Sequence, residues 1–225
     1  MEGKKKSLIS SIMCLCGAVA AVTAIGIGGN AIFSIQSMSV SSYETYEEAV
    51  DEGYKTEIKS QVQSAISVIQ SEYDEYLAGE KIEEEAMEHA KEFVRAMRYR
   101  DDQSGYFWID GLDYNLVVHA VLTDQEGDNR KDLKDQNGVM ITQSVVNVCK
   151  SADKGGYNEF YFTKSDGVTV APKIAYSELF EPWGWCVCTG NYVDDMSAAK
   201  AVVKEEIDKE YMGVLIRTNA VFISA

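Results

Sequence analysis

Two aromatic-rich stretches contain the residue types best suited to binding a small molecule. They are GYFWID at residues 105–110 and PWGWCVCTGNYVDD at residues 182–195. A lysine, Lys173, and one of only two histidines, His119, lie on strand-like segments between them. Aromatic rings can wall a pocket, and a few cationic or hydrogen-bonding groups can orient a polar ligand within it. These residues predict a pocket for a small polar molecule, used either for chemistry or for sensing.

Catalytic signatures are missing from the sequence. There is no GxSxG, HExxH, P-loop or GxGxxG pattern, and no nucleophile–base pair stands out from the two histidines. The cysteines have neither zinc spacing nor a CxxCH haem motif. Cys186 and Cys188 share one face of a predicted strand and cannot easily bridge, so with Cys149 we expect them to be small buried hydrophobic residues. We therefore expect no enzyme activity, no metal and no cofactor.

The N-terminus has the composition of a membrane anchor. Lys4, Lys5 and Lys6 precede an apolar run over residues 8–35, which exceeds the roughly 20 residues that span a bilayer as a helix. Lysines before this run and glutamates after it predict a cytoplasmic N-terminus and an extracytoplasmic C-terminal side. The alternative is a cleaved signal peptide with a site at Ala18-Val19-Ala20, although such peptides have apolar regions of only ~7–15 residues.

The net charge of −15 excludes some partners. A strongly acidic chain is repelled by nucleic acids and by anionic lipid surfaces. We expect no nucleic-acid partner, and the acidity is explained by an exposed, soluble domain.

Hydrophobic periodicity predicts the elements that position the pocket. Helices are predicted over residues 44–77 (continuing out of the anchor), 81–99, 139–150 and after 194, and strands over 106–109, 116–121, 157–163, 168–176 and 183–192. Residues 124–134 are expected to form a solvated charged loop. Short turns between the strands favour an antiparallel sheet, so we expect an α+β fold with five strands and helices on one face.

Three segments follow from this order. Residues 1–35 are a cytoplasmic stub and a transmembrane helix, residues 36–195 an extracytoplasmic domain, and residues 196–225 a C-terminal helix. The last fifteen residues become apolar again. We expect them to begin a second transmembrane segment that is cut short, with a simple helix end as the alternative.

Several motifs, in this order, resemble a known family. They are GYFWID, a following His119, an acidic loop, KDQNG at 134–138, PKIAY at 172–176 and PWGWCVCTGNYVDD. Together they are similar to the single Cache domain, type 2, the extracytoplasmic sensor module of bacterial chemoreceptors and sensor kinases. The resemblance covers about residues 45–195. It implies a long N-terminal helix on a PAS-like antiparallel sheet, a short-carboxylate ligand of two to four carbons, a location in the cell membrane and a homodimer formed through the long helix.

A carboxylate among aromatic rings requires a cation or several hydrogen-bond donors. Lys173 is the best candidate for the cation, and His119 is carried over from a His-Pro of the family. The expected ligand-binding residues are Tyr106, Trp108, His119, Lys173, Tyr176, Trp185 and Tyr192. Structural alternatives stay open: Tyr192 could pack in the core or a turn, and His119 could be a satisfied core group.

The sequence departs from the family at the predicted covering loop. Ala120 stands where the family has a proline, Phe162 where it has a tryptophan, and Lys164-Ser165 where it has Lys-Pro. These differences put ligand identity in doubt. The leading hypothesis is transmembrane sensing of a small molecule, and the alternative is a membrane-anchored binding protein that acts through a separate partner, without its own output domain.

Overall fold

A computed structural model describes residues 2–164, 166 and 168–224. The helices are α1 (Glu2–Leu77), α2 (Glu83–Ala96), α3 (Ile141–Cys149) and α4 (Val193–Ser224), with short 3₁₀ turns η1 (Thr123–Gln125) and η2 (Glu181–Trp183). The strands are β1 (Phe107–Gly111), β2 (Leu116–His119), β3 (Gly155–Thr163), β4 (Val170–Phe180) and β5 (Trp185–Tyr192).

The five strands form one antiparallel sheet in the order β2-β1-β5-β4-β3. The β3–β4 hairpin and the β4–β5 connection through η2 are local, whereas β5 inserts beside β1 from far along the chain. The predicted α+β fold, with a long N-terminal helix and a five-stranded antiparallel sheet, is confirmed.

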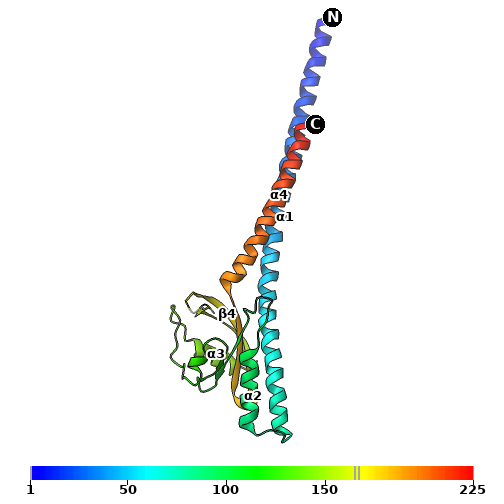
Figure 1. The fold of residues 1–225 in the computed structure, drawn as a ribbon. Coiled ribbons are helices and arrows are strands. Elements are labelled where there is room, and N and C mark those ends of the chain that lie inside the picture. The colour runs from blue at the N-terminus through cyan, green and yellow to red at the C-terminus, as the bar shows by residue number, and fades with distance from the viewer. Residues whose placement is uncertain (1, 165, 167, 225) are drawn as a thin grey trace. The chain divides into compact units, whose positions relative to one another are not determined.

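One face of the sheet is covered by α1 and α2. Ile58, Val62, Ala65 and Ile69 of α1 recur every three or four residues and are buried against β1, β2 and β5. Ala90 and Val94 of α2 join the same core. This stripe is the apolar face that the helical spacing predicts, and Figure 1 shows both helices on one side of β4.

The opposite face is covered by α3 and the loop before it. Ile141, Val145, Val146 and Cys149 of α3 pack on Trp108, Phe160 and Ala175 of the sheet, and Cys186 and Cys188 are buried there as free thiols. The expectation that all helices lie on one face is therefore wrong. Periodicity identified α3 as a helix but could not assign it a face, because both faces of the central strands are apolar.

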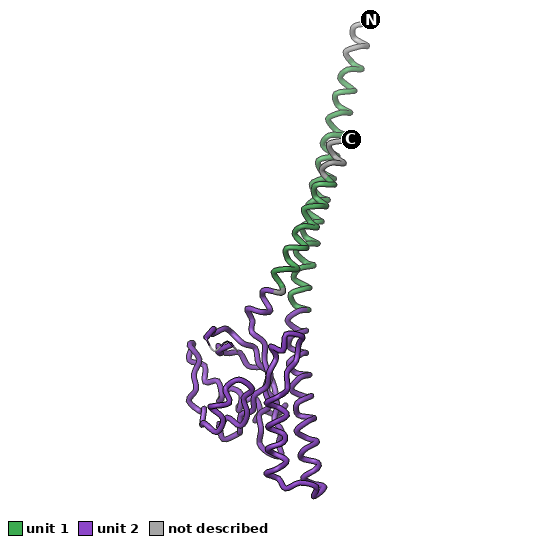
Figure 2. Tube along the Cα trace, in the orientation of Figure 1, with its two compact units in different colours: residues 1–49, 199–225 green, residues 50–198 purple. Residues whose placement is uncertain are grey.

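The chain divides into two compact units (Figure 2). Residues 50–198 form the unit that contains the sheet, and residues 1–49 with 199–225 form the other. In the latter, most large apolar side chains of α1 that the structure describes are exposed, among them Leu8, Ile12 and Val22. Among the described residues, α1 alone is long and apolar enough to cross a membrane. The segment boundaries at 35 and 195 and the second transmembrane segment stay predictions.

Candidate functional site

A narrow cavity lies on the face of the sheet that α3 covers. Its enclosed volume is about 10 Å³, roughly the space that one water molecule requires. The lining residues are Trp108, His119, Arg130, Ile141, Phe160, Phe162 and Lys173. A more open recess of about 320 Å³ shares His119, Arg130 and Phe162 with it. The cavity and the recess together would suit a ligand of few non-hydrogen atoms, held between rings and two cationic side chains.

Lys173 on β4 is the most unusual group of the cavity. Its side chain is 1% exposed, and its ammonium lies 4.3 Å, 4.7 Å and 4.9 Å from the ring centroids of Tyr106, Trp108 and Tyr192. Nζ donates one hydrogen bond, to Tyr106 Oη at 2.9 Å. Within the described part of the chain, no carboxylate forms an ion pair with it. A buried ammonium without a counter-ion is costly, so an anion placed in the cavity would be stabilised by it.

Strand alternation brings these residues together. Successive side chains of a strand point to opposite faces, so Trp108 of β1 and Tyr106, immediately before β1, share a face. Antiparallel pairing then sets Lys173 opposite Tyr192 and Trp108 opposite His119. Five of the seven predicted site residues therefore gather around one ammonium and its cavity.

The hydroxyls of Tyr106 and Tyr192 are 3.4 Å apart, and their pKa values shift in opposite directions. Burial raises the pKa of Tyr106, but the charge and hydrogen bond of Lys173 outweigh it and lower the pKa below its usual value. Burial and the neighbouring Tyr106 raise the pKa of Tyr192. Tyr192 stays protonated and donates to the carbonyl of Thr163 at 2.8 Å, so it is a wall of the site rather than a charged partner.

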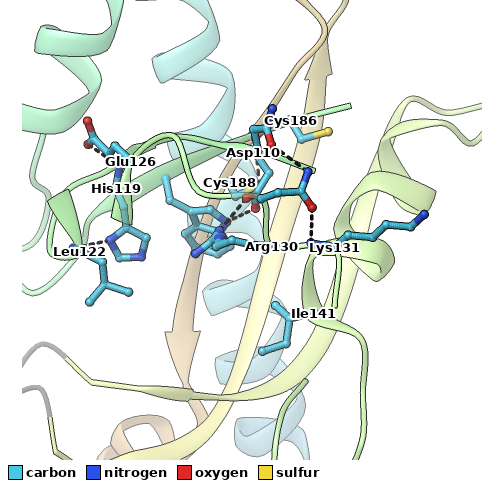
Figure 3. Close-up of polar contacts among 12 residues, drawn as sticks. Asp110, His119, Leu122, Glu126, Arg130, Lys131, Ile141, Cys186 and Cys188 are labelled. Carbon is cyan, nitrogen blue, oxygen red and sulfur yellow. Dashed lines mark hydrogen bonds and ion pairs between the residues drawn. The ribbon is translucent and has the colours of Figure 1, made fainter. Parts of the chain in front are cut away.

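His119 is held in one tautomer. Its Nδ1 accepts hydrogen bonds from the backbone N–H groups of Val121 at 3.1 Å and Leu122 at 2.9 Å. Burial, followed by the charges of Lys173 and Arg130, lowers its pKa to about 3, so the ring is neutral near pH 7. The proton is therefore on Nε2, which no residue in the described ranges engages and which can donate to a ligand. Figure 3 shows the bond to Leu122.

Arg130 is a site residue that the sequence did not reveal. It is 7% exposed, and its Nη2 donates to Asp110 Oδ1 at 2.6 Å (Figure 3). Its Nε is buried and, within the described residues, has no hydrogen-bond partner. The expectation of a solvated loop over residues 124–134 fails at Arg130 because a buried carboxylate on β1 draws this side chain inward.

Asp110 is the buried carboxylate that binds Arg130 beside the cavity. It is fully buried and accepts a second hydrogen bond from the indole Nε1 of Trp108 at 3.1 Å. Burial raises its pKa and Arg130 opposes that shift. An acidic residue on a buried, aromatic strand was the available signal for a buried cation, although it could not say which one.

Tyr176 and Trp185, which were also predicted as ligand contacts, do not line this cavity. Both pack in the core beneath α1 on the other face of the sheet. Tyr176 is an odd number of residues from Lys173, and Trp185 is an odd number from Tyr192. Since strand side chains alternate, neither can share the face of its neighbour in the cavity.

The site can bind and orient an anion, but it contains no evident reacting group. Lys173 and Arg130 provide positive charge, His119 a neutral donor, and four aromatic or aliphatic side chains apolar walls. Among the residues described, no three His, Cys, Asp or Glu side chains gather to hold a metal ion. The arrangement combines positive charge, a neutral donor and apolar walls in one place.

Comparison with known proteins gives consistent matches. The model of the family described as "Single Cache domain 2" matches residues 50–206. Methyl-accepting chemotaxis protein McpP of Pseudomonas putida is 31% identical over 137 residues, which is 61% of this chain and 25% of that protein. Sensor histidine kinase MctS of Rhizobium johnstonii is 27% identical over 184 residues, 80% of this chain and 38% of the kinase. The chain thus spans a quarter to two fifths of these relatives.

Solved structures show the same fold. A Cache chemosensory domain, described for its recognition of carboxylic acids, superposes with a TM-score of 0.61 at 26% identity, covering 65% of this chain and 97% of that domain. A methyl-accepting chemotaxis protein from Vibrio parahaemolyticus superposes with a TM-score of 0.60 at 28% identity, covering 69% and 99%.

Proposed function

Because the chain belongs to the single Cache domain family, which its residues 50–206 match, we propose that it senses short carboxylates outside the cytoplasm. Domains of this family are the ligand-sensing parts of chemotaxis receptors and sensor kinases, as in the relatives found here. The proposed ligand has two to four carbons. We also propose that the chain is anchored in the cell membrane, acts as a homodimer and is not an enzyme.

The observation that carries the carboxylate assignment is the buried ammonium of Lys173. Its nearest polar contact is the phenol of Tyr106, and four aromatic rings surround it within 6 Å. A carboxylate entering the cavity would supply the missing charge and accept hydrogen bonds from Lys173 and from His119 Nε2. The apolar walls at Ile141 and Phe160 would contact a short alkyl chain.

β5 offers a route from the ligand to α1. Tyr192 at its end faces the cavity, while the preceding Asn191 faces the other way. Asn191 Nδ2 donates to Glu57 of α1 at 3.1 Å, and Arg100 bonds to both residues. A shift of β5 on ligand binding would therefore change the contacts of α1. This requires a ligand with different affinities for the two arrangements.

The test is isothermal titration of the full chain in detergent micelles with acetate, propionate, butyrate, pyruvate and lactate. We expect binding of at least one member, and Lys173→Met to weaken it by about a hundredfold or more, as expected for a lost charge-assisted pair. Lys59→Met is the matched control, since Lys59 lies over the Tyr176 ring on the opposite face and should not affect binding.

Thermal unfolding separates loss of the site from loss of the fold. Lys173→Met replaces an uncompensated buried cation by an apolar side chain of similar length, so its melting temperature should stay equal or rise. The carboxylate assignment fails if no member binds at millimolar concentration, or if folded Lys173→Met binds as tightly as wild type.

A further inference from the structure

We propose that this site, taken as the carboxylate site proposed above, accepts monoanions and rejects dianions, and that Asp110 sets this limit. The inference rests on the proposed function and narrows its ligand class. It follows from the number of charges enclosed around the cavity and from which of them already have partners.

The charged side chains around the cavity, Lys173, Arg130 and Asp110, sum to a net charge of +1. Lys173 has no acidic partner among the described residues, whereas Arg130 is paired with Asp110 at 2.6 Å. His119 adds no charge, because its Nδ1 accepts two backbone N–H groups and cannot carry a second proton. The remaining lining groups, Ile141 and the rings, are neutral. One carboxylate would therefore neutralise the cavity.

The second carboxylate of a dianionic ligand would have no unpaired cation near it. Arg130 can offer its unpartnered Nε–H as a donor, but its charge is balanced by the fully buried Asp110. A dianion would thus bury one charge without compensation between apolar rings, which is strongly unfavourable. Discrimination of this kind comes from an unpaired charge on the rejected ligand rather than from better contacts with the accepted one.

Charged groups around the cavity do not alter this balance. Lys164 in the adjoining recess is paired with Asp194 and Asp195 at 2.8 Å and 2.7 Å. Asp135 and Glu159 line a second recess, which shares Phe160 and Lys173 with the cavity. The carboxylate of Asp135 accepts backbone N–H groups there, including that of Tyr161. Both surroundings are acidic, as is the whole chain with a net charge of −15. They would repel a dianion more than a monoanion.

Asp110→Asn is the informative substitution. The amide keeps an acceptor for Trp108 and nearly the same volume, but it leaves the charge of Arg130 uncompensated. The cavity then holds two positive charges, which suits a dianion. In Asp110→Asn/Arg130→Gln one charge is removed again, so the preference for monoanions should return even if affinity for all ligands falls.

The ligands are chosen to separate charge from size. Malonate is a dianion, malonamate is its isosteric monoanion, and propionate is a smaller monoanion. Titration of the full chain in detergent should give binding of propionate and malonamate, with malonate weaker than malonamate by about a hundredfold or more, as an unpaired buried charge requires. Asp110→Asn should reduce that ratio at least about tenfold, and the double variant should restore it.

The outcomes are distinguishable. If no carboxylate binds the wild type, the proposed function itself fails. If propionate binds but malonate binds as tightly as malonamate, or if malonamate is rejected together with malonate, charge does not set the limit and this inference is overturned. It is equally overturned if Asp110→Asn, shown by its thermal transition to be folded, keeps the wild-type ratio of malonamate to malonate.

Discussion

The ammonium of Lys173 shows how much of a buried charge aromatic rings can compensate. Four rings lie within 6 Å of Nζ, and a cation–π contact contributes about 0.5–2 kcal/mol. Burying an ion costs several kcal/mol even after relaxation. The rings and one phenol offset this cost without supplying a full negative charge. The missing charge favours anion binding.

His119 should make the protein less stable in mild acid. Its folded pKa of about 3 lies below the ordinary 6.5, so between these values the unfolded chain binds more protons and stability falls as pH falls. From pH 7 to pH 5 this amounts to about 2 kcal/mol. Urea unfolding at pH 7 and at pH 5 measures this effect. His119→Gln should be less stable than wild type at pH 7, but its unfolding free energy should fall less between pH 7 and pH 5.

The other histidine provides the comparison. His89 lies at the surface beside Glu72, and His89→Gln reports what removal of an exposed histidine does to the same pH slope. If His119→Gln and wild type lose equal stability on acidification, His119 is not held neutral by its surroundings.

At the scale of elements, the site depends on how closely β5 approaches β4. Gly190 lies opposite Ala175 across the pair, and a Cβ there would lie 2.5 Å from the carbonyl of Ile174 and 2.9 Å from Lys173 Cε. No side chain fits without moving the strands or displacing the lysine. Glycine at this position is what permits the long side chain of Lys173 to enter the cavity.

Gly190→Ala should therefore impair both folding and binding. We expect a loss of about 2–4 kcal/mol of unfolding free energy, as for other overpacked core positions, and weaker carboxylate binding because Lys173 is displaced. Chemical denaturation and titration measure the two effects. Gly53→Ala in α1 is the control, since nothing lies within 4 Å of its added Cβ and alanine favours a helix. Equal stability of Gly190→Ala and wild type would contradict this packing argument.

At the scale of the whole molecule, the decisive feature is the uncharged run over residues 7–43 of α1. Its apolar side chains are exposed in the described part of the chain, as expected for a helix whose neighbours are lipids. The acidic sheet unit at residues 50–198 is suited to water. Lys4, Lys5 and Lys6 favour a cytoplasmic start and thus an extracytoplasmic sheet unit.

Alkaline phosphatase joined after Tyr43 in bacterial cells should be active, because it folds only after export. Green fluorescent protein at the same position should be dark, and replacing the three lysines by glutamine should lower the phosphatase signal. The intact mass of the membrane-bound chain should include residues 1–20, which a signal peptide would lose. Active phosphatase on a chain cleaved after Ala20 would exclude the anchor.

The sequence by itself determined the elements and much of the site. Apolar spacing of three and four placed α1, α2 and α3, and the aromatic strands with Lys173 and His119 indicated a pocket, because periodicity and residue chemistry are local properties. Tyr106, Trp108 and Tyr192 also lie around the ammonium. Strand side chains alternate between the two faces of a sheet, and this alternation could have shown that Tyr176 and Trp185 lie on the face opposite Lys173 and Tyr192.

Only the tertiary structure decided which face α3 covers and which charges meet. Arg130 pairs with Asp110, twenty residues earlier, across a loop without local pattern, and no spacing rule predicts that such a side chain turns inward. Burial then determines which charges must be paired. An ionised carboxylate is stable in water, but in a protein core it requires a neighbouring cation to compensate the loss of hydration. Ligand charge is thus a property of the folded cavity, whereas ligand size and polarity were already indicated by the residues.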